Sequence, residues 1–422
     1  MNINEALAFI QAPAAQVSRL GLERVRELMA RLGDPQKKLQ FVHVAGTNGK
    51  GSTAAMLASV LTCAGYKTGL FTSPHLSRYN ERIQIDGEPI SDEDLCAVTE
   101  MTAACARAMD DPPTEFERVT ALALAYYWQK RCDIVVLEVG LGGRLDATNV
   151  IDPPQAAVIT NIGLEHTEIL GDTLEAIAWE KAGIIKSGCA AVSYDSAPAV
   201  QQVLRDVCAK RDVPLRFACF DRLRPGEKNL EGQTFSYGDW EGLTIPLLGE
   251  HQLCNAAVAL ETIGVLRDKG WNISDSAVRT GLARTSWPAR FEVLGREPLF
   301  ILDGGHNPQC AQALAANIRD YLPGQKVNFL MGVLADKAWD EMLDAVWPYG
   351  VSYVCVTPES PRAMEAETLA AQISSRGANA RVCPSIREAV ELCAGIKTPT
   401  VAFGSLYMAG EIRQAYRCLA EK

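Results

Sequence analysis

Histidine is scarce in this sequence, and no two of its cysteines form a Cys-X-X-Cys pair. The 422 residues include five histidines and 13 cysteines, an odd number scattered along the chain. Such a set excludes a dense disulfide framework and is typical of reduced thiols. We therefore expect a cytoplasmic protein in which most cysteines act as small hydrophobic side chains.

Long apolar runs and basic runs are missing as well. The longest near-apolar stretch, residues 120–128, is too short to span a bilayer. Residues 1–5 lack the basic start of a secretory signal. The net charge is −10 and no stretch is rich in lysine and arginine, which disfavours non-specific binding of nucleic acid. We expect neither a membrane nor a nucleic acid as a partner.

The length and the order of apolar stretches predict an α/β protein with two domains. A chain of 422 residues exceeds one ordinary hydrophobic core. Apolar strands alternate with helical patterns, and the alternation restarts after residues 285–290. We expect an N-terminal domain over residues 1–284, a linker or hinge over 285–297 and a Rossmann-like, doubly wound domain over 298–422.

A glycine-rich turn joins the strand expected at 41–45 to a helix. The turn offers close backbone approach, N–H donors and a lysine, which are the requirements of a phosphate site. Strict Walker A spacing fails, because Val44 replaces its first glycine and Gly51 follows Lys50 directly. We still interpret the first domain as a P-loop-type mononucleotide-binding domain; the alternative is an ordinary turn. The residues of the loop are Gly46, Thr47, Asn48, Gly49, Lys50, Gly51 and Ser52.

Side chains that suit Mg²⁺ follow the buried strands of this domain. Glu138 interrupts an apolar strand at its carboxyl end, where ligands bind in open parallel sheets. Ser52 and Ser73 supply hydroxyl oxygens, which Mg²⁺ accepts. For Glu138 taken singly, the alternative is an exposed strand-end carboxylate. His166 alone is more often a structural histidine, and Lys181 alone has the pattern of an exposed helix lysine.

The second half contains two similar junctions between a strand and a loop. Asp303 and His306 follow one apolar strand, and Ser405 and Tyr407 follow another. Side chains in such loops lie at the carboxyl edge of a doubly wound sheet, where ligands bind. Plain turn chemistry is the alternative for both segments.

Taken together, these segments resemble the folylpolyglutamate synthase/dihydrofolate synthase family, a branch of the Mur ligase superfamily. They occur in the family's order over nearly the whole chain. Cell-wall Mur ligases carry an additional N-terminal domain, and the 45 residues before Gly46 are too few to form it. The segments that carry the resemblance are 46–52, 72–76 (TSPHL), 137–146 (LEVGLGGRLD), 180–184 (EKAGI), 251–255 (HQLCN), 288–292 (PARFE), 303–308 (DGGHNP) and 404–407 (GSLY).

The resemblance implies a nucleotide site. It implies that the glycine-rich loop binds ATP, with Lys50 at the terminal phosphates. Asn255, Arg290 and Asp303 are implied to contact the nucleotide. One departure is that position 289 holds Ala289 where a glycine is usual in the family.

The resemblance also implies two Mg²⁺ ions. Ser52, Ser73 and Glu138 are the implied ligands of the first ion, and His166 of the second. Lys181 corresponds to a lysine that the family carbamylates. A carbamate is a hard oxygen donor that suits Mg²⁺, so the resemblance overturns the interpretation of Lys181 as an exposed lysine.

Substrate contacts are implied for both halves of the chain. A reduced folate is expected near residues 73–82, with Ser73 and Arg82 in contact. The side chains of His306, Ser405 and Tyr407 resemble the family's site for the incoming glutamate. The catalytic candidates are Lys50, Lys181 and His306.

The function expected from this resemblance is ATP-dependent ligation of L-glutamate to the γ-carboxylate of a reduced folate through an acyl phosphate. Dihydropteroate is a further candidate for the first substrate, as in a dihydrofolate synthase. A Mur-like amide ligase for another acid and amino acid is one alternative, and a non-catalytic nucleotide-gated switch is another. We expect a monomer whose domains close over the acyl phosphate, with small molecules as its partners.

Overall fold

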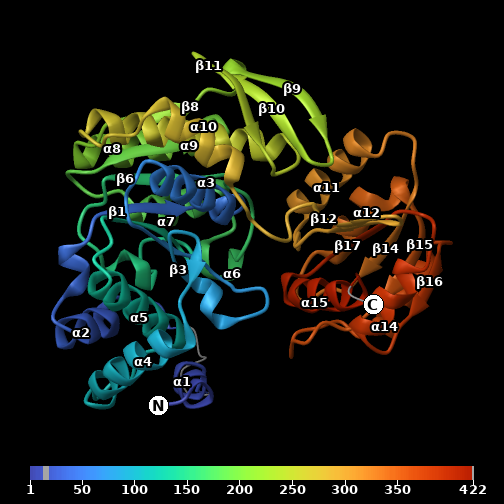
Figure 1. Ribbon diagram of the computed structural model, residues 1–422, viewed down its shortest axis with the longest axis horizontal. Helices are drawn as coiled ribbons and strands as arrows, with labels where there is room; N and C mark the ends of the chain where they lie inside the picture. Colours follow the sequence, from blue (N-terminus) through green and yellow to red (C-terminus); the bar gives the residue numbers. More distant parts are fainter. Residues whose placement is uncertain (13–18, 421–422) are drawn as a thin grey trace. The chain divides into compact units, whose positions relative to one another are not determined.

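The computed structural model describes residues 1–12 and 19–420, and contacts within the chain divide it into two compact units (Figure 1). Each unit is built on its own mostly parallel sheet, which confirms the predicted α/β fold class. Unit 1 comprises Met1–Arg224, Phe235–Thr244 and Leu253–Thr285; unit 2 comprises Pro225–Thr234, Ile245–Gln252 and Ser286–Lys422.

Unit 1 contains an eight-stranded sheet with the strand order β4-β3-β2-β5-β1-β6-β7-β8. Strands β2, β5, β1, β6, β7 and β8 are parallel, and β3 and β4 add an antiparallel edge. The apolar sequences of β1 and β5 agree with the complete burial of both strands. The strands are β1 (Phe41–Ala45), β2 (Thr68–Phe71), β3 (Ile83–Ile85), β4 (Glu88–Pro89), β5 (Ile134–Glu138), β6 (Ala156–Ile159), β7 (Ala190–Tyr194) and β8 (Leu215–Ala218).

Helices pack on this sheet in hydrophobic clusters. One cluster joins α2, α4 and α5 to β5, and another joins α7 and α8 to β6. Short 3-10 turns η2 (Pro35–Lys38), η3 (Tyr79–Arg82), η4 (Ala147–Val150), η5 (Ala182–Ile184) and η6 (Phe220–Arg222) lie between the longer elements. The helices are α1 (Ile3–Ile10), α2 (Glu23–Arg31), α3 (Lys50–Cys63), α4 (Asp92–Arg107), α5 (Glu115–Gln129), α6 (Thr167–Leu170), α7 (Leu174–Lys181), α8 (Pro198–Arg211), α9 (Glu250–Asp268) and α10 (Asp275–Arg284).

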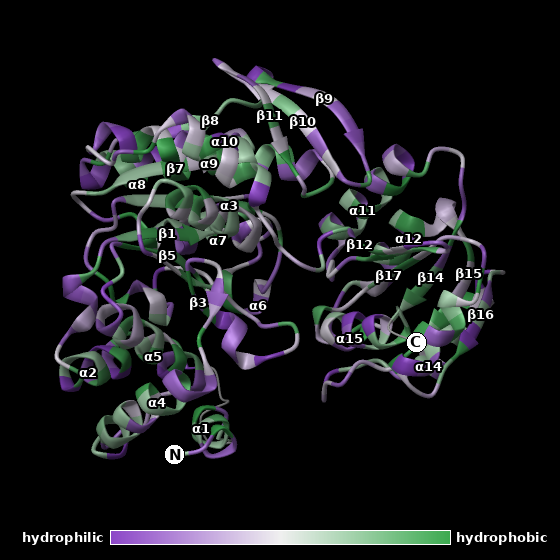
Figure 2. Ribbon diagram, viewed as in Figure 1, coloured by the Kyte–Doolittle hydropathy of each residue, from purple (hydrophilic) through white to green (hydrophobic). Residues whose placement is uncertain are grey.

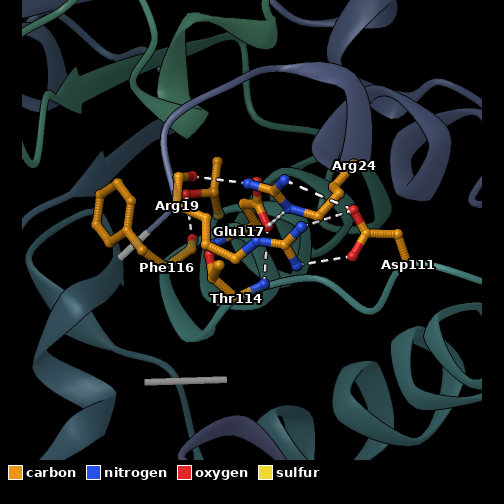
Figure 3. Close-up of polar contacts among 7 residues, drawn as sticks. Arg19, Arg24, Asp111, Thr114, Phe116 and Glu117 are labelled. Atoms are coloured by element: carbon orange, nitrogen blue, oxygen red, sulfur yellow. Dashed lines mark hydrogen bonds and ion pairs between the residues drawn. The ribbon is translucent and has the colours of Figure 1, made fainter. Parts of the chain in front are cut away.

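Two arginines, Arg19 before α2 and Arg24 in its first turn, connect this part of the chain to the start of α5 (Figure 3). Arg19 donates two hydrogen bonds to the Asp111 carboxylate, at 2.7 and 3.0 Å. Arg24 donates to Glu117 at 3.0 Å, and Glu117 also closes the capping box of α5 with Thr114. Because Arg24 and Glu117 are both buried, removing either partner would leave an uncompensated buried charge. This anchor stabilises the start of a helix whose side chains pack on β5.

Unit 2 contains a six-stranded sheet with the order β12-β13-β17-β14-β15-β16. Only β12 is antiparallel to its neighbour; the other pairs are parallel. Its strands are β12 (Glu292–Arg296), β13 (Leu299–Leu302), β14 (Val327–Met331), β15 (Gly350–Cys355), β16 (Asn379–Val382) and β17 (Thr400–Phe403). Its helices and 3-10 turns are α11 (Pro308–Tyr321), α12 (Trp339–Val346), η7 (Trp347–Tyr349), α13 (Ala366–Ser375), α14 (Ile386–Ala394), η8 (Leu406–Met408) and α15 (Ala409–Ala420).

A three-stranded sheet of β9 (Leu223–Asn229), β10 (Gly232–Tyr237) and β11 (Trp240–Ile245) contributes residues to both units. Strand β9 is hydrophilic and largely exposed, whereas alternate residues of β10 are buried (Figure 2). In unit 1, Tyr237 donates to Glu261 of α9 at 2.8 Å. In unit 2, Lys228 pairs with Asp320 of α11 at 2.7 Å.

The main-chain division between the units falls between Thr285 and Ser286. Within the segment 285–297, for which the sequence predicts a linker, residues 292–296 form β12 and pair with β13. Residues 225–234 and 245–252, expected in the N-terminal domain, cluster with unit 2, and Leu248 lies in the hydrophobic core of that unit. Packing between segments that are far apart in the chain cannot be predicted from the local sequence pattern. The hinge role of 285–297 stays a prediction.

Within the described ranges, no helix is both long and apolar enough to cross a membrane.

Candidate active site

The predicted site residues of unit 1 follow four neighbouring parallel strands. The sheet order places β2, β5, β1 and β6 side by side. Ser73 follows β2, Glu138 ends β5, the glycine-rich loop follows β1, and His166 lies in the loop after β6, at the start of α6. The carboxyl ends of parallel strands meet at one sheet edge, which is where ligands bind in such folds.

The glycine-rich loop joins β1 to α3, as the sequence predicts, and is held against the segment that follows β6. The Thr47 amide donates to the Asn161 carbonyl at 2.7 Å, and the Thr160 hydroxyl donates to the Asn48 carbonyl at 2.8 Å. A Cβ at Gly46 would lie 1.8 Å from the Thr160 hydroxyl oxygen, so only glycine allows this approach. Helix α3 begins at Lys50, so that Gly51 and Ser52 lie in its first turn. The N–H groups of that turn are a ready site for an anion.

Two lysines donate to the same carbonyl oxygen of this loop. Lys50 Nζ lies 3.0 Å from the Gly46 oxygen and 3.1 Å from the Thr47 oxygen. Lys181 Nζ, from the last residue of α7, lies 2.9 Å from the same Gly46 oxygen. Burial lowers the pKa of Lys181 from 10.5 to about 7, and the positive charge of Lys50 adds to the effect. A large fraction of Lys181 is therefore an uncharged, nucleophilic amine near neutral pH.

Backbone packing explains why Lys181 is only 5% exposed. A Cβ at Gly143 would lie 2.8 Å from the Lys181 carbonyl oxygen, so the loop after β5 presses directly on the end of α7. The neighbouring Arg144 donates from its backbone to the Glu180 carbonyl at 2.8 Å and pairs with the Glu180 carboxylate at 2.9 Å. These contacts bring α7 to the sheet edge and turn its last side chain toward the loop.

The structure brings Glu138 and Ser73 together. The Ser73 amide donates to Glu138 Oε2 at 3.1 Å, and Glu138 is 4% exposed, which rules out the solvent-exposed alternative. Ser52 is also buried, at the start of α3. Hydroxyl and carboxylate oxygens are hard donors of the kind that Mg²⁺ takes. No group of three or more histidine, cysteine or acidic side chains suited to a metal occurs among the described residues, so a metal here would depend on the serines.

Asn255 approaches the glycine-rich loop from α9, far along the sequence. A Cβ at Gly49 would lie 2.4 Å from Asn255 Oδ1, and the same oxygen accepts a hydrogen bond from the Tyr194 hydroxyl. The backbone at Gly49 has φ = 85°, a left-handed conformation that favours glycine. The contact of Tyr194 was not predictable from the sequence, because no motif near β7 indicates a contact with the loop.

We expect Gly49→Ala to raise the KM for ATP about 10-fold or more, because the new methyl group displaces Asn255 or the loop. Gly65→Ala is the matched control: its φ is 90°, but nothing lies within 4 Å of a Cβ there. Both variants should lose about 1 kcal/mol of folding free energy through backbone strain. Steady-state kinetics at varied ATP, with urea unfolding alongside, separates the two effects. An equal change of KM in both variants would contradict the proposed contact.

In unit 2, Asp303 ties together the two predicted nucleotide segments. It follows β13, and its carboxylate accepts from the Phe291 amide at 2.9 Å and from the Gly305 amide at 2.7 Å. Arg290, in the first of these segments, donates to the Ala289 carbonyl at 2.9 Å. The backbone at Ala289 has φ = 57°, a left-handed conformation in which glycine is less strained than alanine.

His306 and Ser405 lie in the loops after the neighbouring strands β13 and β17. The Gly404 amide donates to the Gly305 carbonyl at 3.1 Å, which joins the two loops. His306 Nδ1 lies 3.1 Å from the Gly304 oxygen, and the buried Ser405 hydroxyl accepts from the Tyr407 amide at 3.2 Å.

Tyr407 is half exposed, and its hydroxyl contacts Arg362 of the loop before α13 at 3.4 Å. Arg362 also pairs with Asp336 at 2.9 Å. The sequence analysis did not single out Arg362, which lies 45 residues from Tyr407.

His251 is a further residue of this cluster to which the sequence analysis gave no role. Burial lowers its pKa; the nearby Arg290 charge adds to this, and the Asp303 charge opposes it. A Cβ at Gly249 would lie 2.7 Å from His251 Cε1, so the glycine permits the close fit of the ring. The available signal was the segment HQLCN, in which only Asn255 received a role.

Comparisons with known proteins agree with this arrangement. The Mur ligase middle domain matches residues 44–263, and the Mur ligase glutamate ligase domain matches residues 289–401. A dihydrofolate synthase/folylpolyglutamate synthase of Bacillus subtilis is 37% identical over 409 residues, which cover 93% of this chain and 94% of the relative. Escherichia coli FolC in complex with DHPP and ADP superposes with a TM-score of 0.87 at 32% identity, covering 100% and 99% of the two chains. An FPGS–AMPPCP–folate complex gives a TM-score of 0.84 at 34% identity, covering 98% and 99%.

The two domain matches and the sheet-edge site define the chain as a Mur ligase. Within that class, the identity to relatives over nearly their whole length is decisive. The chain belongs to the folylpolyglutamate synthase/dihydrofolate synthase family, which confirms the resemblance found in the sequence.

Proposed function

We propose that this chain is an ATP-dependent ligase that joins L-glutamate to a carboxylate of a reduced folate, and that it also accepts dihydropteroate. The observation that carries the proposal is the pair of lysines, Lys50 and Lys181, that donate to one carbonyl of the glycine-rich loop. Glu138 at the end of β5 and Ser73 after β2 lie on the strands next to this loop. The family supports the choice of acid and amino acid, because relatives of both names cover the chain.

Residues of unit 1 provide for the transfer of the γ-phosphoryl group of ATP to the acid. The N–H groups at the start of α3 bind phosphate oxygens, and Lys50 leaves the Gly46 and Thr47 carbonyls to neutralise the terminal phosphates. The carboxylate oxygen of the acid forms the new bond to phosphorus, the bond to ADP breaks, and an acyl phosphate results. Positioning and charge neutralisation supply most of the acceleration in such transfers.

Ser52, Ser73 and Glu138 would hold Mg²⁺, and His166 is the proposed ligand of a second ion. Bound Mg²⁺ would neutralise negative charge on the nucleotide. Lys181 in its uncharged form can add to CO₂: a nitrogen–carbon bond forms, and a proton leaves. The resulting carbamate replaces a buried positive charge by a negative one, which suits a neighbouring cation.

Residues of unit 2 are proposed to receive the incoming amino acid. His306, Ser405 and Tyr407 would bind L-glutamate. Arg290 and Asp303 of the same unit, and Asn255 of unit 1, are proposed to contact the nucleotide. In the second step the amine of glutamate attacks the acyl carbon, the amide bond forms, and inorganic phosphate leaves with the electron pair. Water must be kept from the acyl phosphate for this step to succeed.

The test is ADP release in the presence of ATP, Mg²⁺ and L-glutamate, with tetrahydrofolate or dihydropteroate as the acid. We expect release to depend on both the acid and glutamate, and to occur with each acid. Turnover with neither acid would refute the proposed function. A Mur-like ligase for another acid predicts release only with that acid, and a nucleotide-gated switch predicts none under any condition.

A further inference from the structure

Two aromatic side chains fix the guanidinium of Arg82: His75 contacts its Nε edge, and Tyr79 contacts its planar face. Its Nε donates to Nδ1 of His75 at 2.9 Å. Its Cζ lies 4.8 Å from the centre of the Tyr79 ring, in cation–π contact. The ring of His75 lies 5.1 Å from that of Tyr79 and is tilted by 50° to it, so the three side chains form one cluster. Within residues 1–12 and 19–420, no hydrogen-bond partner is found for the two terminal nitrogens of Arg82.

The backbone explains how two residues seven positions apart meet. The Glu81 carboxylate accepts from the amides of Leu76, Ser77 and Arg78, at 2.7, 3.2 and 2.9 Å. These bonds fold the loop over the turn η3, at whose end Arg82 lies. All of these contacts lie within six residues, so the conformation of the loop is set locally.

The sheet then places Arg82 beside the candidate metal ligands. Strands β2 and β3 are antiparallel, and the Thr72 amide donates to the Arg82 carbonyl at 3.0 Å. Ser73 is the next residue, and its amide is bonded to Glu138. Arg82 is therefore at the sheet edge where phosphoryl transfer is proposed, and not at a remote surface.

The hydrogen-bond chemistry decides which edge of the guanidinium is available. A guanidinium has donors only, so Nδ1 of His75 must accept, and the proton of the imidazole is on Nε2. Arginine binds a carboxylate with two parallel N–H groups, either Nε with one terminal nitrogen or the two terminal nitrogens. Because His75 occupies Nε, only the edge with the two terminal nitrogens remains for a ligand.

We propose that His75 is a positioning residue that locks the guanidinium of Arg82, so that its two terminal nitrogens bind a carboxylate of the folate or pteroate substrate. Tyr79 supports the same orientation from the ring face, and its own hydroxyl is held by Glu115 at 3.2 Å. The inference rests on the proposed function and deepens it, since it names the group that orients the acid.

The test compares His75→Ala with His75→Asn, because the amide oxygen of asparagine can take the place of Nδ1 as an acceptor. We expect His75→Ala to raise the KM for tetrahydrofolate about 10-fold, with kcat changed less than about threefold and the KM for ATP unchanged. His75→Asn should restore the KM to within about threefold of the wild type. A purely structural role would change the KM for ATP and the KM for folate together.

A double-mutant cycle with Arg82→Lys completes the test. Lysine has no Nε donor at this position, so His75→Ala should add nothing to the KM for folate in that background. Additive effects of the two substitutions would overturn the inference, and so would a wild-type KM in His75→Ala while Arg82→Lys is impaired. Failure of the proposed function is distinguishable, because the wild-type chain would then show no folate-dependent ADP release at all.

Discussion

Replacing Lys181 by methionine should lower kcat about 100- to 1,000-fold, a loss typical of removing a preorganised charged group from an active site. Methionine keeps the volume of the side chain but cannot form a carbamate. The substitution also removes a hydrogen bond to the Gly46 carbonyl, which still accepts from Lys50. Steady-state ligation at saturating ATP and folate measures the effect, and wild-type activity should fall when CO₂ is removed.

The same substitution should change the pH dependence of stability. The pKa of Lys181 is about 7 in the folded chain and near 10.5 when the side chain is exposed. The unfolded chain therefore binds more protons between pH 7 and 10.5, and the stability of the wild type rises with pH across that window. Below pH 7 Lys181 is charged in both the folded and the unfolded chain, so the folded chain bears the full free-energy cost of burying that charge. We expect Lys181→Met to exceed the wild type in free energy of unfolding by roughly 1–3 kcal/mol at pH 6, and by less at pH 9.

Lys186→Met is the matched control. Lys186 also donates from a largely buried position to backbone carbonyls, those of Asn149 and Ile151, and burial lowers its pKa to about 8. It lies outside the proposed site, so its loss should alter stability and leave kcat within about threefold of the wild type. Equal losses of kcat in the two variants would contradict the special role of Lys181.

Lys50→Met should lower kcat about 1,000-fold, because Lys50 is the cation that the glycine-rich loop offers to the terminal phosphates. In the structure its ammonium lies on two loop carbonyls, so its removal leaves no buried charge without a partner. We expect the thermal midpoint to change little, and the loss to appear in kcat more than in the KM for folate. The measurement is single-turnover ADP formation by the folate-bound enzyme.

Lys67→Met serves as the control for a general loss of charge. Lys67 is exposed at the start of β2, at the opposite end of the strand from Ser73. Its substitution should leave kcat unchanged. If Lys50→Met kept more than about a tenth of wild-type kcat, the phosphate role of the loop lysine would be wrong.

The amino-acid sequence was sufficient to predict the features that depend on short-range patterns of residues. The strand, glycine turn and helix at 41–63 are visible because each has its own short-range pattern, and the structure has β1 and α3 there. Glu138 was recognisable because it ends an apolar strand, and it is indeed buried at the strand end. The family resemblance added the residue roles, which stay predictions.

Features that depend on packing between residues far apart in the chain could not be predicted in the same way. The eight residues of α7 carry no local sign that Lys181 is buried; that follows from Gly143, which packs against the end of the helix. The contact between Asn255 and the Gly49 position joins residues 206 apart, and the charges of Asp303 and Arg290 act on His251 from two other segments. The assignment of 225–234 and 245–252 to unit 2 likewise depends on side chains such as Leu248, whose partners are distant in the chain.

The most direct test of ligation through an acyl phosphate follows an oxygen atom. Tetrahydrofolate labelled with ¹⁸O in its γ-carboxylate is incubated with the wild-type chain, ATP, Mg²⁺ and L-glutamate, and the products are analysed by mass spectrometry. Ligation through an acyl phosphate predicts a folate lengthened by one glutamyl residue and one ¹⁸O atom in each inorganic phosphate released. Inorganic phosphate without the label would contradict an acyl phosphate intermediate. ADP formed with no lengthened folate would contradict glutamate ligation.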